Sequence, residues 1–189
     1  MVTLQAVAQE SEGIELKVVF AGSMGAGKTT AIRTISEIET ISTDVPNNDL
    51  AAHSKETTTV GLDYGEASLG DNAVLRMYGT PGQERFRFMW DILGEGAFGV
   101  IVLVDNSQPD PLAGMDTYLD VFLRHVPAWR IVVGVGRTEM YPTPTIADFC
   151  DHIARRGVSL PVLSVDVRRA ADVRLLLTVL VNNVEVDHG

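Results

Sequence analysis

Residues 22 to 29 read Gly22-Ser23-Met24-Gly25-Ala26-Gly27-Lys28-Thr29 and form a complete G-x-x-x-x-G-K-[ST] motif. The run before it, residues 16–21, has the apolar character of a buried strand, and residues 30–38 have the apolar spacing of a helix. A strand, a glycine-rich loop and a helix in this order form the structural context that a phosphate loop requires. The sequence therefore predicts a nucleotide-binding phosphate loop at this position.

Each part of this loop has a physical role in holding phosphate. The glycines permit a tight turn that presents backbone N–H groups to phosphate oxygens, and the start of the next helix adds its positive dipole end. Lys28 is expected to reach the β- and γ-phosphates, and the Thr29 hydroxyl is expected to bind Mg²⁺. The nucleotide-binding residues predicted here are Gly22, Ser23, Met24, Gly25, Ala26, Gly27, Lys28, Thr29 and Thr30.

The length and charge of the chain limit the classes of protein to consider. With 189 residues, we expect a loose leader over residues 1–13 and a single nucleotide-binding domain over residues 14–189. A net charge of −10 should repel nucleic-acid backbones, so we expect no nucleic-acid partner. The sequence has no signal-peptide pattern, no apolar run of 18 residues and no lipidation signature, which favours a cytoplasmic protein without a direct membrane anchor.

Cys150 is the only cysteine of the chain, so no intrachain disulfide can form. It belongs to the apolar series Ile146, Phe149, Cys150 and Ile153, whose spacing is that of one helix face. We therefore expect Cys150 to be a core residue rather than a nucleophile.

Strand-like and helix-like patterns alternate along the chain. Apolar runs such as residues 100–104 and 131–133 are typical of parallel strands buried on both faces, and Gly70-Asp71 predicts a hairpin turn. The expected strands are 15–22, 59–69, 72–79, 97–105, 130–135 and 160–165, and the expected helices are 27–38, 83–94, 112–126, 145–156 and 169–186. The predicted fold is α/β, with a six-stranded, mostly parallel sheet, one antiparallel edge strand and helices on both faces.

Residues 39–58 have neither a helical nor a strand pattern. Loops of this length inside a compact domain are usually functional or disordered. The segment lies between the phosphate-loop helix and the second expected strand, where a nucleotide-sensing loop would be placed.

A second motif follows the third expected strand, where residues 79–86 read Gly79-Thr80-Pro81-Gly82-Gln83-Glu84-Arg85-Phe86. Together with the phosphate loop and residues 59–64, this run resembles the Ras superfamily of small GTPases, especially its Rab and Arf branches. The longer run 79–90 is most similar to a bacterial Ras-like group described only as ATP/GTP-binding proteins. The resemblance covers nearly the whole chain after residue 14 and implies the P-loop NTPase fold of a Ras-like G domain.

The resemblance also implies roles for residues at matching positions. Thr59 would coordinate Mg²⁺ and sense the γ-phosphate, the Gly82 N–H would meet the γ-phosphate, and Gln83 would orient the attacking water. The catalytic set is then Gln83, Lys28 and Thr59, the metal ligands are Thr29 and Thr59, and the cofactor is Mg²⁺ with GTP as substrate and GDP as product. For Arg85 and Arg87 we favour solvated positions over arginine-finger roles.

Two departures from the family pattern concern the phosphate side of the site. Gly79 stands where the family's D-x-x-G motif has its aspartate. Either Asp63 substitutes for it from the neighbouring strand, or Mg²⁺ is held mainly by Thr29, Thr59 and phosphates, with weaker affinity as the expected result. Met24 replaces a glycine of Ras, and its bulk would hinder an arginine finger supplied by a partner.

A third departure concerns the nucleobase. The family's N/T-K-x-D motif corresponds here to Gly136-Arg137-Thr138-Glu139. Glu139 keeps a carboxylate for guanine, and Arg137 keeps a positive stem that can lie over the base, whereas Gly136 offers no side chain. Ser164 is the only match to the family's S-A-K loop. We favour GTP over ATP, with a relaxed preference, because a site that lacks base contacts discriminates less.

Three functions fit these observations. The first is a small Ras-like GTPase that acts as a GTP/GDP-dependent switch with slow intrinsic hydrolysis. The alternatives are a nucleotide-dependent binding module with negligible hydrolysis and a P-loop ATPase or phosphotransferase. Expected partners are protein effectors, and an activating or exchange protein, at switch regions 39–59 and 79–94. Most of Phe86, Phe88, Met89 and Trp90 should pack the second switch against the sheet, with at least one aromatic exposed as an anchor.

Overall fold

The strand that leads into the phosphate loop is the middle strand of a seven-stranded sheet, whose order is β2-β3-β4-β1-β5-β6-β7. The structure, a computed structural model, describes residues 13–42, 61–70 and 73–186. Strands β4, β1, β5, β6 and β7 are parallel, whereas β3 runs antiparallel to β4 and to β2. The strands are β1 Ile14–Ala21, β2 Ile41–Ser42, β3 Asp63–Gly70, β4 Ala73–Gly79, β5 Gly99–Asp105, β6 Ile131–Gly136 and β7 Val162–Ser164.

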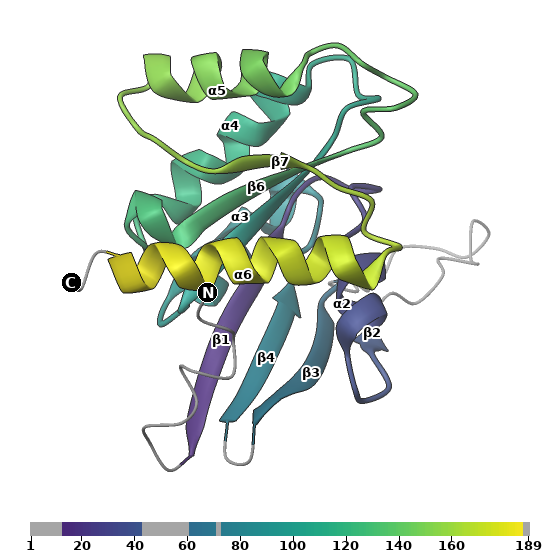
Figure 1. Cartoon of the computed structure of the whole chain (residues 1–189), viewed down its shortest axis with the longest axis vertical. Helices are drawn as coiled ribbons and strands as arrows, with labels where there is room; N and C mark the ends of the chain where they lie inside the picture. Colours follow the sequence, from purple (N-terminus) through teal and green to yellow (C-terminus); the bar gives the residue numbers. More distant parts are fainter. Residues whose placement is uncertain (1–12, 43–60, 71–72, 187–189) are drawn as a thin grey trace, which may run out of the picture.

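The helices cover both faces of the sheet, as predicted. Helices α2 and α6 pack on one face, where α6 crosses in front of β1, and α3, α4 and α5 cover the other face (Figure 1). The helices are α2 Lys28–Ile35, α3 Arg87–Gly94, α4 Pro111–Phe122, α5 Ile146–Arg155 and α6 Ala170–Val186, with short 3₁₀ helices η1 Glu84–Phe86 and η2 Ala128–Arg130. In the described parts of the chain, none of these helices has both the length and the apolar character needed to cross a bilayer.

The apolar strands lie where their sequence predicts. All seven residues of β5 are buried, because helices cover it on both sides and strands flank it at both edges. The antiparallel pairing of β3 with β4 confirms the hairpin that Gly70-Asp71 predicts, although residues 71–72 themselves lie outside the described residues. The α/β fold with a mostly parallel sheet is therefore confirmed.

The predicted number of six strands is wrong by one. The additional strand, β2, lies inside the segment 39–58 for which the sequence predicts no regular structure. Both of its residues are exposed, so they leave no alternating apolar pattern, and the strand is defined only by pairing with Asp63 and Tyr64 of β3. Residues 43–58 of that segment, and residues 1–12 of the leader expected at 1–13, lie outside the described residues.

The expectation that Cys150 is a core residue is also wrong, because its side chain is exposed. The core face of α5 is formed by Phe149 and Ile153, with Ile146 packed against the same cluster. Cys150 follows Phe149 by one residue, a rotation of about 100° around the helix, which turns it toward solvent.

The parallel strands bring the functional segments together at one end of the sheet. The phosphate loop follows β1, the Gly82-Gln83 segment follows β4, and the base-motif segment 136–139 follows β6. Because these strands are parallel, their carboxyl ends form one edge, which is where open α/β sheets bind their ligands.

Trp90 of α3 is the largest fully buried side chain, with 0% of its surface exposed. Its ring packs against Tyr118 of α4 with the ring centroids 4.4 Å apart, and its indole N–H donates to the Pro81 carbonyl at 2.7 Å. Phe86 is also buried, whereas Phe88 is 58% exposed. The expected division between packing and exposed aromatics in this segment is confirmed.

We expect Trp90→Ala to lower the free energy of unfolding by about 3–5 kcal/mol, because it removes a fully buried indole and leaves a cavity. Phe88→Ala, two residues away on the same helix, is the matched control and should change it by less than about 0.5 kcal/mol because the ring is largely in solvent. Urea unfolding followed by circular dichroism measures both. Equal effects of the two substitutions would contradict the packing described for Trp90.

Candidate functional site

The phosphate loop connects β1 to α2 through backbone conformations that only glycine adopts easily. Gly22 has φ 145°, and a Cβ at this position would lie 2.2 Å from the Leu103 carbonyl oxygen of β5. Gly27 caps α2 in the left-handed conformation with φ 94°. The close approach to β5 and the left-handed cap explain why these two motif positions require glycine.

Lys28 lies in the first turn of α2, and only 7% of its surface is exposed. Its ammonium group donates to the carbonyl oxygens of Gly22 and Ser23, each at 2.8 Å. The positive charge is thereby held against the loop, close to the backbone N–H groups that a phosphate loop offers to anions.

The next residue connects the loop to the neighbouring strand β3. The Thr29 hydroxyl donates to Oδ2 of Asp63 at 2.6 Å, and Asp63 is buried. A hydroxyl that donates its proton in this way keeps its oxygen lone pairs for another ligand, such as a metal ion. Thr59, which the family resemblance names as the second metal ligand and a catalytic residue, lies outside the described residues.

Gly82 and Gln83 lie on the other side of the phosphate loop. A Cβ on Gly82 would come within 2.5 Å of the Met24 backbone nitrogen, so the two loops pack backbone against backbone. Together with Lys28, Thr29 and Asp63, they line a cavity of about 280 Å³. The cavity therefore joins the predicted phosphate-binding, metal-binding and water-orienting residues.

Tyr118 of α4 supports this segment, and no sequence motif points to it. Its hydroxyl donates to the Gly82 carbonyl oxygen at 3.3 Å, while Trp90 bonds the preceding carbonyl, that of Pro81. Burial, followed by the nearby charge of Glu84, raises the pKa of Tyr118, so the hydroxyl stays protonated and remains a donor. Both carbonyls before Gln83 are thus fixed by buried aromatic side chains.

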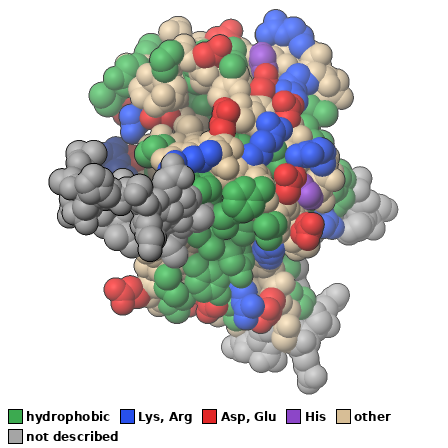
Figure 2. Space-filling model, turned by 180° about the vertical axis from the view of Figure 1, so that it is seen from behind, with side chains coloured by type: hydrophobic (Ala, Val, Ile, Leu, Met, Phe, Trp, Pro, Cys, Tyr) green, Lys and Arg blue, Asp and Glu red, His purple; other side chains and the backbone are tan. Residues whose placement is uncertain are grey.

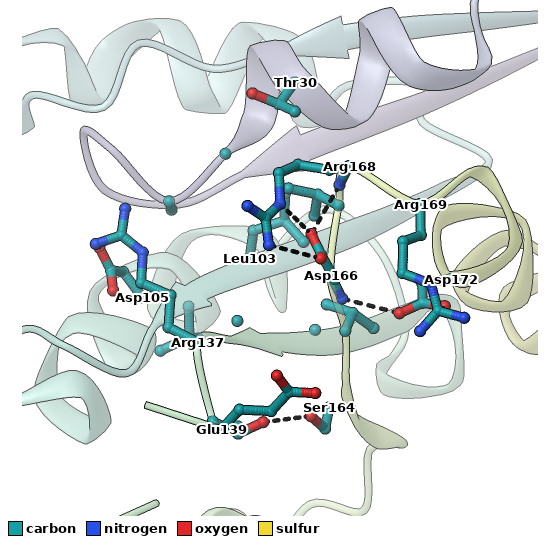
Figure 3. Close-up of a pocket in the computed structure, with 18 of the residues that line it drawn as sticks. Thr30, Leu103, Asp105, Arg137, Glu139, Ser164, Asp166, Arg168, Arg169 and Asp172 are labelled. Carbon is teal, nitrogen blue, oxygen red and sulfur yellow. Dashed lines mark hydrogen bonds and ion pairs between the residues drawn. The ribbon is translucent and has the colours of Figure 1, made fainter. Parts of the chain in front are cut away.

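A second and larger cavity, of about 710 Å³, opens at the carboxyl ends of β5, β6 and β7 (Figure 3). Arg137, Glu139 and Ser164, the residues predicted for nucleobase binding, all line it. Gly25, Gly27 and Thr30 line both cavities, so the phosphate loop lies between them. All predicted nucleotide-binding residues in the described part of the chain therefore line these cavities or, as Gly22 and Ser23 do, hold Lys28.

Arg137 links the base side of the site to the phosphate loop. It has φ 63°, and its guanidinium lies 3.1 Å from Oδ2 of Asp105 and donates to the carbonyl oxygen of Gly25 at 3.4 Å. Burial alone would raise the pKa of Asp105, but hydrogen bonds from Ser107, together with Gln108 and the Arg137 charge, outweigh it and lower that pKa. Sequence reasoning missed Asp105, because only the side-by-side arrangement of β5 and β6 places it beside Arg137.

An ion pair occupies the wall of this cavity formed by the segment after β7. The Arg168 guanidinium donates to both carboxylate oxygens of Asp166, each at 2.8 Å, and the Asp166 N–H donates to Asp172 at 2.9 Å (Figure 3). The hydrogen bonds from Arg168 lower the pKa of Asp166 to about 2. In this segment the backbone N–H of Val165 is also used, since it donates to Val135 in the sheet.

We expect Arg168→Ala to raise the pKa of Asp166 from about 2 toward the value of about 3.9 of an isolated aspartate. Because the folded-state pKa is depressed, the stabilisation from this pair is present above about pH 4 and is lost as the pH falls from about 4 to 2. Carboxyl carbon shifts in an NMR titration measure the change. Arg169→Ala, which removes a more weakly acting charge, is the control, and an equal shift in both variants would contradict the assigned cause.

Comparisons with known proteins identify sequences that this chain resembles. The profile of a family described as "Conserved hypothetical ATP binding protein" matches residues 38–123. Relatives include an uncharacterized protein of Methanocaldococcus jannaschii, 30% identical over 94 residues, which are 50% of this chain and 53% of the relative. Ras-related protein Rab-18-B of Danio rerio is 29% identical over 108 residues (56% of this chain, 47% of the relative). Ras-related protein RABA1c of Arabidopsis thaliana is 26% identical over 123 residues (64% of this chain, 51% of the relative).

The chain spans about half the length of the curated relatives that it matches. The strand order around the phosphate loop and the similarity to Ras-related proteins together establish the P-loop NTPase fold.

Proposed function

We propose that this chain, a Ras-superfamily small-GTPase-like protein, is a molecular switch that binds GTP with Mg²⁺ and hydrolyses it slowly to GDP. The observation that carries the proposal is the cavity in which Lys28 and Thr29 of the phosphate loop face Gly82 and Gln83 of the segment after β4. A phosphate loop alone supports nucleotide binding, whereas this pairing also supports hydrolysis and a response to the γ-phosphate.

In this proposal, hydrolysis depends on positioning and on stabilising charge at the transferred phosphoryl group. Lys28 and the N-terminus of α2 supply positive charge to the β- and γ-phosphates, and the Gly82 N–H donates to the γ-phosphate. Gln83 orients the attacking water. Thr29 and Thr59 would hold Mg²⁺, which would neutralise further phosphate charge.

Guanine is the proposed base because Glu139 lines the large cavity and offers a carboxylate to the donor groups of guanine. Arg137, which follows β6, lines one side of that cavity and donates to the Gly25 carbonyl of the phosphate loop. The N–H groups of Val165 and Asp166 already donate within the protein, so these two groups are not available to the guanine O6. We therefore propose a guanine preference that is weaker than an intact base motif would give.

A protein partner would read the nucleotide state through the switch segments. Seen from the side opposite α6, hydrophobic side chains form a continuous area over the middle and lower part of the molecule (Figure 2). On α3, within the proposed switch region 79–94, Phe88 is 58% and Ile92 60% exposed, one helical turn apart. We propose that these two side chains contact an effector, because exposed apolar residues beside a nucleotide-sensing segment suit that role. Most of the other switch region, 39–59, lies outside the described residues.

The proposed substrate is tested by nucleotide affinity on nucleotide-stripped protein. We expect GTP and GDP to bind more tightly than ATP and ADP, and Mg²⁺ to raise triphosphate affinity. Glu139→Ala should remove the difference between guanine and adenine nucleotides, because it removes the carboxylate that would accept from the guanine N1–H and 2-amino group, a pair of donors that adenine lacks. Titration of fluorescent nucleotides measures this. Equal affinities in the unsubstituted protein would contradict the guanine preference and favour the P-loop ATPase or phosphotransferase alternative.

The proposed hydrolysis is tested by substitution at Gln83. Gln83→Leu should slow single-turnover hydrolysis at least about tenfold and leave GTP affinity nearly unchanged, because it removes only the group that orients water. Arg85→Ala is the control and should retain the rate of the unsubstituted protein, since Arg85 is exposed and does not line the cavity. Unchanged hydrolysis in Gln83→Leu would exclude Gln83 from the mechanism.

The second candidate function is a nucleotide-dependent binding module with negligible hydrolysis. It is favoured by Gly79, which lacks the carboxylate of the D-x-x-G motif. Tight nucleotide binding with phosphate release at the background rate would support this candidate over the switch.

A further inference from the structure

We infer that Asp63 of β3 supplies the carboxylate that position 79 of β4 lacks, and that it couples Mg²⁺ to nucleotide binding in this chain. The inference deepens the proposed function and rests on it, because it concerns the metal that would accompany the nucleotide. Three observations carry it: the register of β3 with β4, the space above Gly79 and the bond to Thr29.

The register places the two positions directly opposite each other. Asp63 is the cross-strand partner of Gly79 in the antiparallel pair of β3 and β4. Facing residues of an antiparallel pair have their Cβ atoms about 4.5–5.5 Å apart and project on the same side of the sheet. A carboxylate at either position can therefore occupy nearly the same place at this end of the sheet.

The space above Gly79 is filled by the Asp63 side chain. A Cβ built on Gly79 would lie 2.9 Å from both Cβ and Oδ2 of Asp63. An aspartate at position 79 and one at position 63 would thus compete for one volume. The close approach of Asp63 requires a glycine at position 79. The absence of a carboxylate at position 79 and the presence of one at position 63 therefore depend on each other.

The hydrogen bond to Thr29 shows that the Asp63 carboxylate is directed toward the phosphate loop. Oδ2 of Asp63 accepts the Thr29 hydroxyl proton at 2.6 Å, and Asp63 is only 6% exposed. Thr29 follows Lys28 in the phosphate loop and carries the hydroxyl that would ligate Mg²⁺. By accepting its proton, Asp63 turns the oxygen lone pairs away from itself, which is how a supporting carboxylate orients a metal ligand.

A purely structural role is the competing interpretation, in which Asp63 only ties α2 to β3 through Thr29. Asparagine at position 63 separates the two roles. Its side-chain oxygen can still accept the Thr29 proton, but it lacks the negative charge that favours Mg²⁺ and its bound water. If Asp63 only links α2 to β3, Asp63→Asn should keep both the link and the effect of Mg²⁺ on nucleotide binding. If Asp63 supports the metal, Asp63→Asn should lose that effect.

The experiment measures the dissociation rate of a fluorescent GDP analogue from the full chain, with Mg²⁺ and with EDTA. In the unsubstituted protein we expect Mg²⁺ to slow dissociation. In Asp63→Asn this effect should fall at least about tenfold, with the rate in EDTA nearly unchanged. The exchange of positions, Asp63→Gly with Gly79→Asp, should restore most of the Mg²⁺ effect, because the carboxylate returns to the same volume from the other strand.

The single substitutions Asp63→Gly and Gly79→Asp are the matched controls for this exchange. The first should lose the Mg²⁺ effect, because no carboxylate remains. The second should unfold at lower urea concentration, because two carboxylates meet in one buried volume. Urea unfolding of every variant shows which of them are folded.

The outcomes are distinct. A full Mg²⁺ effect in Asp63→Asn would overturn the inference and leave the proposed function intact, as would a folded exchange variant that does not regain the effect. If the unsubstituted protein binds GDP without any effect of Mg²⁺, the proposed Mg²⁺-dependent switch itself fails.

Discussion

The close packing of backbone around the phosphate loop is the constraint on which the rest of the site depends. Gly22 lies against the Leu103 carbonyl of β5, and Gly82 lies against the Met24 nitrogen, so that a Cβ at either position would overlap main-chain atoms. Main-chain atoms cannot move aside as a flexible side chain can. The β1 loop, the β4 loop and the end of β5 are therefore fixed relative to one another before any side chain is considered. These backbone contacts set the positions of Lys28, Thr29 and Gln83.

Much of the fold could be predicted from the sequence, because its signals are local. The phosphate loop has fixed glycines, β5 is a continuous apolar run, and α6 has a clear helical spacing. The strand β2 could not be predicted, since two exposed residues leave no pattern and only their partners on β3 define them. The apolar series around Cys150 predicts a core position wrongly, because such a series can include a residue at the edge of the buried helix face.

The site follows the same division between local and long-range information. The motif residues 22–29, 82–83 and 137–139 lie around two adjoining cavities, as their order along parallel strands requires. The sequence does not predict Tyr118 or Asp105 as site residues, because each contacts a site residue that is distant in sequence. The pair Asp166–Arg168 is not predicted either, because it depends on the conformation of the segment after β7. Asp63 could be predicted only in part from the sequence. The absence of an aspartate at position 79 made it one of two alternatives, and only the strand register shows that the two positions share one space.

The two aromatic anchors of the β4 loop have a consequence for how a nucleotide signal would leave the site. Trp90 fixes the Pro81 carbonyl and Tyr118 fixes the Gly82 carbonyl, so the chain up to Gly82 is attached to α3 and α4. In the proposed switch, a rearrangement that follows loss of a phosphate would therefore be centred on Gln83 and the start of η1. The segment that could move is short, because Phe86 and Trp90 are both buried and pack the chain against the core within two helical turns of Gln83. In the described segment that follows β4, the proposed switch would therefore change the position of few residues, and the exposed face of α3 is the surface that such a change would move.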